Sequence, residues 1–289
     1  MAEEQNASSC SGSCSSCGTS GCGSRTAKED ASTARAHVKH VIGVVSGKGG
    51  VGKSLVTCLL ASELNKRGYK VGILDADITG PSIPKALGLT GRLMGDKDGI
   101  LPHESAHGIK AVSTNLMLDQ EDAPVAWRGP VVTGLLKQFF SDTNWEELDY
   151  LLIDMPPGTS DVFLTVMQTM NVQGIVTVAA PQDLVSMIVG KAVNLAQTMH
   201  ILTLGLVENM AYFKCDECGK KHYIFGEPTG AEVAKRYSIP ATAELPLDPE
   251  FARLVDAGKI EKYDVEGALD QVIDQILAIP ELYSAALEE

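Results

Sequence analysis

The sequence has no long hydrophobic run and no internal repeat. No apolar segment reaches the ~18 residues that a helix needs to cross a membrane, so we expect no membrane insertion. The first residues include Glu3 and Glu4 and lack the apolar core of a secretory signal. Acidic residues there also disfavour a transit peptide. We therefore predict a cytoplasmic protein.

Basic residues are scarce. The 289 residues include 24 Lys and Arg against 37 Asp and Glu, which gives a net charge of −13. Because nucleic-acid binding depends on clustered positive charge, this composition disfavours a nucleic-acid partner. Hydrophobic residues, at 44%, are abundant enough for the core of one large α/β domain or two small ones.

The chain changes character near residue 37. Residues 1–36 are rich in Ser, Ala and Gly, and we predict a disordered arm there unless a ligand orders it. Residues 37–289 are predicted to form the folded domain. In it, apolar β-branched runs at 40–46, 70–76, 109–113, 149–155, 174–180 and 202–209 alternate with helical patterns at 52–68, 131–140, 183–199 and 229–238. This alternation predicts an α/β fold, a doubly wound and mostly parallel sheet flanked by helices.

A phosphate-binding loop follows the first predicted strand. The segment GKGGVGKS, Gly47 to Ser54, fits the pattern G-x-x-x-x-G-K-[ST] and precedes a predicted helix, as a P-loop requires. Its glycines allow successive N–H groups to point at phosphate oxygens, and the helix adds its positive end. Lys53 can reach the β- and γ-phosphates, and Ser54 can ligate Mg²⁺.

Carboxylates end two of the predicted strands. Asp75 and Asp77 are two residues apart, so in an extended chain they would share one face near the phosphate. Asp154 closes a hydrophobic strand, where the Walker B aspartate of a P-loop enzyme is found. Asp161 fits a helix cap instead.

Cys215 and Cys218 form a C-x2-C pair that suits a metal site. Iron–sulfur clusters and structural zinc ions usually take four ligands, so one chain provides two unless His222 or the arm contributes. A symmetric dimer would bring two pairs together. The alternatives are a bridging iron–sulfur cluster, a zinc site and a redox disulfide. Cys58, within an apolar helix, is expected to be an inert core thiol.

Four more cysteines, Cys10, Cys14, Cys17 and Cys22, lie in the Ser/Gly-rich arm. Their short spacings allow them to wrap one metal centre at modest entropic cost. A disulfide staple is disfavoured in a reducing cytosol. A 4Fe–4S site, a zinc site and a metal-free arm remain open.

The motifs together resemble one family. GKGGVGKS has the deviant P-loop form KGGxGK[ST], which occurs in MinD, ParA, the nitrogenase iron protein and Mrp-type carriers. LDADITGPSIP, WRGP, LDYLLIDMPPGTSD, VENMAYFKCDECG and IFGEPTG resemble the Mrp/ApbC/Nbp-type iron–sulfur carrier ATPases over about residues 38–280. The arm departs from the Nbp pattern, because its first cysteine gap is much shorter.

The resemblance implies functional roles. P-loop residues are expected to hold ATP and Mg²⁺, and the second lysine of the loop, Lys48, is expected to contact the nucleotide of a partner subunit. Asp77 is expected to position the attacking water, Asp154 to support Mg²⁺, and Asn209 to recognise adenine. The predicted nucleotide-binding set is Gly47, Lys48, Gly49, Gly50, Val51, Gly52, Lys53, Ser54, Asp154 and Asn209.

The family's activity is delivery of a 4Fe–4S cluster to apo-proteins, coupled to ATP hydrolysis. The resemblance thus implies a homodimer with a cluster bridged by Cys215 and Cys218, and cluster donors and recipients as partners. The principal alternative is a MinD/ParA-like positioning ATPase with structural zinc at the cysteine pair. The acidic C-terminal segment and the net charge disfavour membrane or DNA recruitment, and the tight C-x2-C spacing disfavours a nitrogenase-type reductase.

Overall fold

The computed structural model describes residues 37–77, 82–97, 99–117, 129–158, 161–181 and 185–280, all within one compact unit, Ser32–Glu289. The arm at 1–36, with its four cysteines, lies outside the described residues. So does the WRGP motif up to Arg128.

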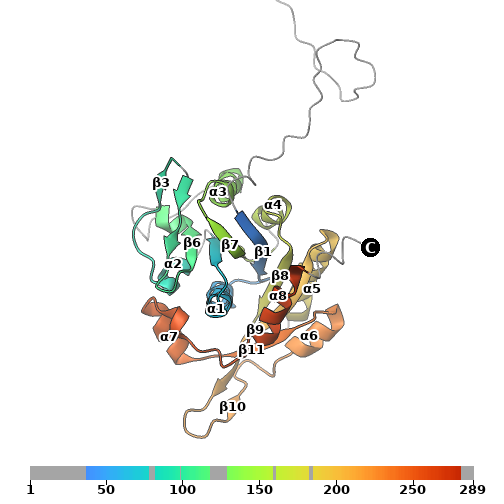
Figure 1. Ribbon diagram of the computed structural model, residues 1–289. Coiled ribbons are helices and arrows are strands. Elements are labelled where there is room, and N and C mark those ends of the chain that lie inside the picture. Colours follow the sequence, from blue (N-terminus) through green and yellow to red (C-terminus); the bar gives the residue numbers. More distant parts are fainter. Residues whose placement is uncertain are drawn as a thin grey trace, which may run out of the picture. The chain divides into compact units, whose positions relative to one another are not determined.

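A mixed sheet forms the centre of this unit (Figure 1). Within the described residues nine strands join it, in the order β10-β9-β8-β1-β7-β2-β6-β5, with β11 also pairing β9. All pairings are parallel except those of β10 with β9 and β5 with β6. The strands are β1 (His37–Val45), β2 (Val71–Asp75), β5 (His103–Glu104), β6 (Lys110–Ser113), β7 (Glu147–Asp154), β8 (Gly174–Ala179), β9 (Leu202–Lys214), β10 (Lys221–His222) and β11 (Thr242–Pro246).

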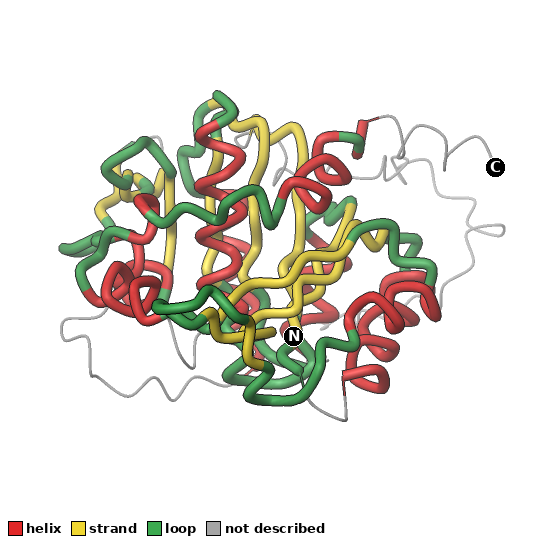
Figure 2. The backbone as a smooth tube through the Cα atoms, turned by 90° about the horizontal axis from the view of Figure 1, so that it is seen from below, coloured by secondary structure: helices red, strands yellow, loops and turns green. Residues whose placement is uncertain are grey.

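Helices cover both faces of the sheet. One hydrophobic core joins one face to α1, α2 and α8, and a second joins the other face to α3, α4 and α5. Seen from below, α1 runs alongside the strands, which agrees with its contacts to β1, β2, β7 and β8 (Figure 2). The helices are α1 (Lys53–Lys66), α2 (Ile83–Leu87), α3 (Gly129–Ser141), α4 (Asp161–Thr169), α5 (Val185–Thr198), α6 (Gly230–Tyr237), α7 (Pro249–Asp256) and α8 (Asp270–Leu277), with 3-10 turns η1 (Thr114–Met117) and η2 (Ile260–Lys262).

Strand burial explains why short apolar runs became strands. The residues of β2 and β8 are buried along their whole lengths, as expected where helices cover both faces of a parallel sheet. The predicted α/β fold is therefore confirmed. None of the helices that the structure describes combines the length and hydrophobicity needed to cross a bilayer.

The sequence patterns missed several short elements. The hairpin of β3 (Met94–Asp96) and β4 (Gly99–Leu101), and the antiparallel strands β5 and β10, have few residues and little apolar pattern. Strand β9 also runs five residues past its predicted end at Asn209. Tertiary pairing with β11 and β10 extends it.

Candidate functional site

The P-loop lies between β1 and α1. Gly50 and Gly52 have φ values of 80° and 82°, which a residue with a side chain adopts only with strain. Lys53 begins α1 directly after the second of these glycines. The loop therefore places backbone N–H groups and the positive end of a 14-residue helix at one point.

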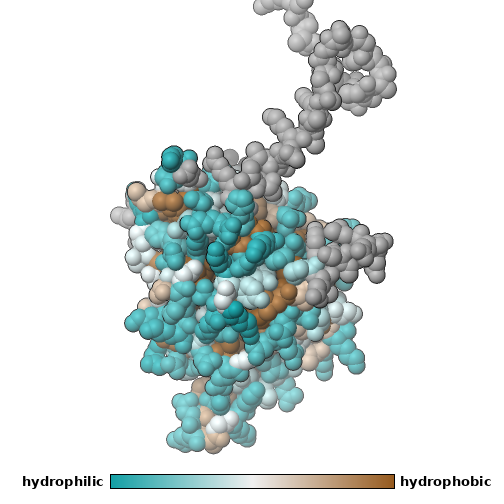
Figure 3. All heavy atoms as spheres, in the orientation of Figure 1, coloured by the Kyte–Doolittle hydropathy of each residue, from teal (hydrophilic) through white to brown (hydrophobic). Residues whose placement is uncertain are grey.

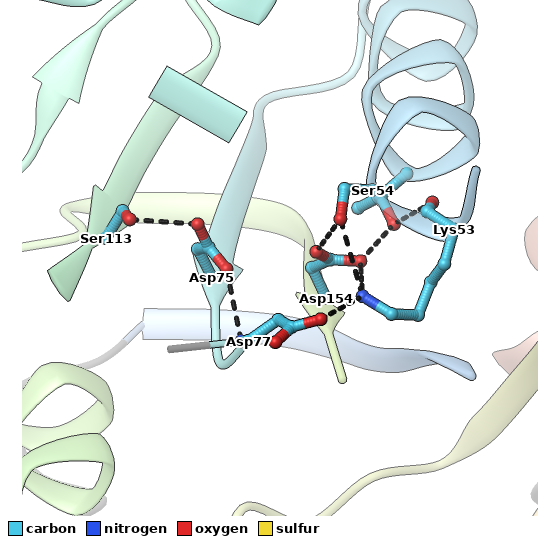
Figure 4. A network of polar contacts seen from close by, with 7 residues as sticks. Lys53, Ser54, Asp75, Asp77, Ser113 and Asp154 are labelled. Atoms are coloured by element: carbon cyan, nitrogen blue, oxygen red, sulfur yellow. Dashed lines mark hydrogen bonds and ion pairs between the residues drawn. The ribbon is translucent and has the colours of Figure 1, made fainter. Parts of the chain in front are cut away.

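Asp154 is the centre of the polar network beside this loop (Figure 4). Its carboxylate is fully buried and lies 2.7 Å from Lys53 Nζ. It also accepts hydrogen bonds from the hydroxyls of Ser54, at 2.5 Å, and Thr57, at 3.0 Å. Burial raises the pKa of Asp154, and the Lys53 ammonium opposes that rise.

Asp75 and Asp77, the two aspartates predicted at the end of the second strand, contact different groups. Strand β2 ends at Asp75, and the Asp77 N–H turns back to donate to the Asp75 carboxylate at 3.1 Å. Asp75 also accepts from Ser113 Oγ at 2.8 Å, whereas the Asp77 carboxylate lies 3.6 Å from Lys53 Nζ (Figure 4). Strand β2 ends at Asp75, and the shared face of the two carboxylates stays a prediction.

Asp75 is a buried acid beside a second one. It pairs in register with Asp154 on the neighbouring strand β7. Burial raises the pKa of Asp75 well above its usual range, and the charge of Asp154 adds to the rise. Lys53 thus pairs with two carboxylates, those of Asp154 and the partly buried Asp77, and this excess of negative charge favours a further cation here.

This donor set fits Mg²⁺. The groups are the Ser54 hydroxyl and the carboxylates of Asp154 and Asp77, which are the oxygen ligands that Mg²⁺ prefers. No softer donor is among them. Ser54 and Asp154 would hold the ion, directly or through water.

Asn209 lies against the P-loop. Its amide Nδ2 donates to the Val51 carbonyl at 3.0 Å, and the Asn209 side chain is buried. A Cβ on Gly52 would lie 2.3 Å from that nitrogen, so the contact requires glycine. Strand β9 therefore contacts the nucleotide loop directly. The adenine role that the resemblance assigns to Asn209 stays a prediction.

A cavity of about 670 Å³ extends from the loop. Its polar wall includes three P-loop glycines and four polar side chains, namely Gly49, Gly50, Gly52, Lys53, Ser54, Asp77 and Asn209. The wall continues over the apolar residues Met210, Leu247, Phe251 and Val255. Polar groups at one end and apolar groups at the other suit a nucleotide, with phosphates at the loop and base over the apolar wall. The sequence patterns did not predict the apolar wall, because α7 carries no motif. They also did not predict the role of Thr57, because the second turn of α1 carries none.

Lys48 is exposed on the loop, whereas Lys53 is buried against Asp154. Gly49 and Gly50 beside it are also exposed, while Gly47 is half-buried and Val51 is buried. The position of Lys48 on the outer side of the loop is compatible with contact to a second subunit.

The cysteine pair forms the tip of the β9–β10 hairpin. Cys215 N–H donates to Lys220 O at 3.0 Å, and Gly219 N–H donates to Cys215 O at 2.8 Å. Backbone N–H groups of Cys218 and Glu217, followed by the Cys218 side chain, lower the pKa of Cys215 by hydrogen bonding to its sulfur. This turn therefore favours the thiolate that a metal binds.

One chain supplies only two ligands at this turn. Among the described residues no cluster of three His, Cys, Asp or Glu side chains could hold a metal ion. His222 is exposed on β10 and pairs with Phe213. Cys58 is fully buried in α1, and burial raises the pKa of its thiol well above the usual range. It remains a neutral core thiol.

Comparisons with known proteins identify the family. A family model described as ParA, NUBPL iron-transfer P-loop NTPase, matches residues 37–278. The chain belongs to this iron-transfer P-loop NTPase family. The resemblance predicted from the motifs is thereby confirmed.

Relatives of this family member cover most of its length. It is 49% identical over 268 residues to the iron-sulfur cluster carrier protein of Clostridium perfringens, covering 90% of this chain and 94% of that one. Identity to the cytosolic Fe-S cluster assembly factor CFD1 of Kluyveromyces lactis is 39% over 227 residues, with 76% and 80% covered. The nucleotide-binding protein from Archaeoglobus fulgidus in complex with ADP has a TM-score of 0.71 at 43% identity, with 79% and 90% covered.

Proposed function

We propose that this protein is an ATP-hydrolysing carrier that holds a 4Fe–4S cluster and transfers it to apo-proteins. One observation carries the proposal. Strand β9 contacts the P-loop through Asn209 and ends, five residues later, immediately before Cys215. A nucleotide site and a thiolate site on one continuous strand suit an enzyme that couples ATP turnover to cargo handling. Relatives named as iron–sulfur cluster carriers support it.

ATP hydrolysis is assigned to the P-loop side. The loop N–H groups and Lys53 bind the β- and γ-phosphates, and Asp77, next to Lys53, orients the attacking water. Mg²⁺ bound by Ser54 would neutralise charge on the phosphates. Lys48 adds a cation to the nucleotide of the partner subunit. These cations stabilise the negative charge that develops as the γ-phosphoryl group transfers to water.

Cluster binding is assigned to Cys215 and Cys218 of two chains. Two pairs related by a two-fold axis, each of a half-buried Cys215 and an exposed Cys218, provide the four thiolates of a 4Fe–4S cluster. A cluster held at an exposed hairpin tip is accessible to donors and to recipient apo-proteins. We therefore propose a homodimer, acting in the cytoplasm.

Anaerobic reconstitution tests the cluster assignment. We expect Cys215→Ala/Cys218→Ala to lose the bridging cluster, measured as iron and acid-labile sulfide per chain, and to retain ATP binding. Cys58→Ala is the matched control, because its thiol is buried in the core, and we expect unchanged iron content. Equal iron and sulfide in the double variant and the wild type would contradict the assignment.

Metal identity separates this proposal from a positioning ATPase with structural zinc. If the protein were such a positioning ATPase, the protein purified anaerobically would contain one zinc ion per dimer and no labile sulfide. We expect labile sulfide and iron in about equal amounts, as in a 4Fe–4S cluster.

A further inference from the structure

Strand β9 has one paired edge and one open edge where it reaches the cysteines. The peptide groups of Phe213 and Cys215 face β10, because Cys215 N–H donates to Lys220 O. Successive peptide groups of a strand point to opposite edges. The N–H and C=O of Lys214 therefore face the other edge, on which Tyr212 O accepts from Leu247 N–H at 2.7 Å.

The start of α7 leaves that edge uncovered. Strand β11 follows β9 as far as Pro246, which pairs with Tyr212. Asp248 then caps α7 by accepting from Glu250 N–H at 2.8 Å, and Pro249 occupies the first turn. The chain turns away from the sheet, and on this edge Lys214 N–H and C=O make no hydrogen bond to another described residue.

A cavity of about 750 Å³ lies along the open edge. Residues 212–215 of β9 and its continuation form one wall, and α7 with residues 262–268 forms the other. Apolar side chains, including Leu254, Tyr263 and Val265, line its inner part, and Cys215 opens onto it. Its volume is within the ~300–1,000 Å³ typical of ligand pockets.

We propose that this edge binds an extended, cysteine-containing peptide segment of the apo-protein that receives the cluster. The segment adds to the sheet beside Phe213–Cys215 and exchanges hydrogen bonds with the N–H and C=O of Lys214, as in β-strand addition. An apolar side chain of the segment packs on the inner wall. The inference rests on the proposed function, because it names the kind of partner that the cluster site serves.

Docking there brings a second thiol beside Cys215. In the exchange, an iron–sulfur bond to the peptide cysteine forms as the bond to Cys215 breaks. The proton of the peptide thiol passes to the Cys215 thiolate, so no electrons are gained or lost.

The charges of the cavity favour a basic segment. Three lysines and five carboxylates line it, namely Lys214, Lys221, Lys262, Asp216, Asp248, Glu250, Asp264 and Glu266. The projecting hairpin at β10, at the lower end of Figure 3, carries both hydrophilic and hydrophobic residues. A strand with an alternating apolar face and lysines at its ends therefore fits better than an acidic one.

Amide exchange with a synthetic probe tests the proposal on the full-length, metal-free protein. The probe is the acetylated and amidated peptide KVTCVTK. We expect it, at about 1 mM, to slow exchange of the Lys214 amide about tenfold or more. The Cys215 amide, already bonded to Lys220 O, should change little. Absence of binding, or binding without protection of Lys214, would overturn the proposal.

Two comparisons, one between probes and one between variants of Lys214, identify the contact as strand addition. Two further probes are N-methylated at alternate residues, one at the odd positions and one at the even positions. The probe whose methyl groups face β9 should bind at least about tenfold more weakly than the unmethylated probe, because it cannot donate to Lys214 O. Lys214→Pro, which removes an N–H that the fold does not use, should weaken probe binding, whereas Lys214→Ala keeps that N–H and should retain binding. Binding of both N-methylated probes as tight as that of the unmethylated probe would contradict the proposal even if Lys214→Pro failed to fold.

The outcomes also separate this inference from the proposed function. Probe binding is measured without a cluster. Failure of the peptide-binding test therefore leaves the proposed cluster site intact, and failure of cluster reconstitution leaves the peptide-binding inference intact. Concentration-dependent protection of Lys214 without any probe would instead identify a second copy of the chain as the occupant and overturn the inference.

Discussion

At the residue scale, the nucleotide site depends on a few charges with very different burial. Lys53 is 6% exposed and paired with the fully buried Asp154, whereas Lys48 is on the exposed side of the loop. The same residue type therefore serves two purposes. Lys53 is part of the folded core of the site, whereas Lys48 is exposed on the loop, and its contact with a second subunit stays a prediction.

We predict that Lys48→Ala and Lys53→Ala each abolish ATP turnover, a loss of at least about 10²-fold in kcat. Each removes a cation from the charge that develops on the phosphate. Steady-state phosphate release measures the effect, and Lys70→Ala, a surface lysine 67% exposed, is the control.

Stability distinguishes the two lysine variants. Lys53→Ala leaves the Asp154 carboxylate without its ion-pair partner, which should cost about 3–5 kcal/mol of unfolding free energy and lower Tm. Lys48→Ala should lower Tm much less, because the Lys48 side chain is exposed. Wild-type turnover in Lys48→Ala would rule out the proposed role of this residue across a subunit interface.

At the element scale, helix packing depends on glycines that no motif reveals. Gly190 of α5 faces Tyr237 of α6, and a Cβ there would lie 2.3 Å from the Tyr237 hydroxyl oxygen. Gly134 of α3 is exposed, and a Cβ there would meet nothing within 4 Å. Both glycines are within helices, so replacing each by alanine separates the effect of side-chain packing from the effect of intrinsic helix propensity.

We predict opposite effects of Gly190→Ala and Gly134→Ala on stability. Gly190→Ala should lower the free energy of unfolding by about 1–3 kcal/mol, because the helix pair is overpacked. Gly134→Ala should raise it by about 0.5–1 kcal/mol, because alanine favours the helix. Urea denaturation measures both, and shifts of the same sign would contradict the packing argument.

The secondary-structure patterns predicted the elements that build the P-loop site. The runs at 40–46, 70–76 and 149–155 became β1, β2 and β7, and their buried apolar residues explain why periodicity sufficed. It failed for β10 and for the last five residues of β9, since these residues are strands only because partners from elsewhere in the chain pair with them.

At the scale of the whole molecule, the cysteines of the arm and those of the hairpin belong to separate parts of the chain. The arm, residues 1–36, lies outside the described residues, and the 4Fe–4S site at Cys10, Cys14, Cys17 and Cys22 stays a prediction. Within residues 37–280, the P-loop and Cys215 each line a cavity.

We predict that replacing Cys10, Cys14, Cys17 and Cys22 by Ser in the full chain removes about four iron atoms per chain. ATP turnover should persist, because the P-loop contacts with Asp154 and Asn209 are within residues 37–280. Iron and sulfide counts after anaerobic reconstitution measure the loss, and a chain that begins at His37 should give the same counts. Unchanged iron in both variants would indicate a metal-free arm.

The sequence by itself determined the α/β fold, the P-loop, the C-x2-C pair and the family, because each depends on local spacing or on apolar periodicity. Tertiary structure alone decided three other features: the burial of Lys53 between two carboxylates, the contact of Asn209 with Val51, and the open edge at Lys214. Each joins segments distant in the chain. Residue spacing therefore cannot encode them, and only the packing of α7, β9 and the P-loop brings them together.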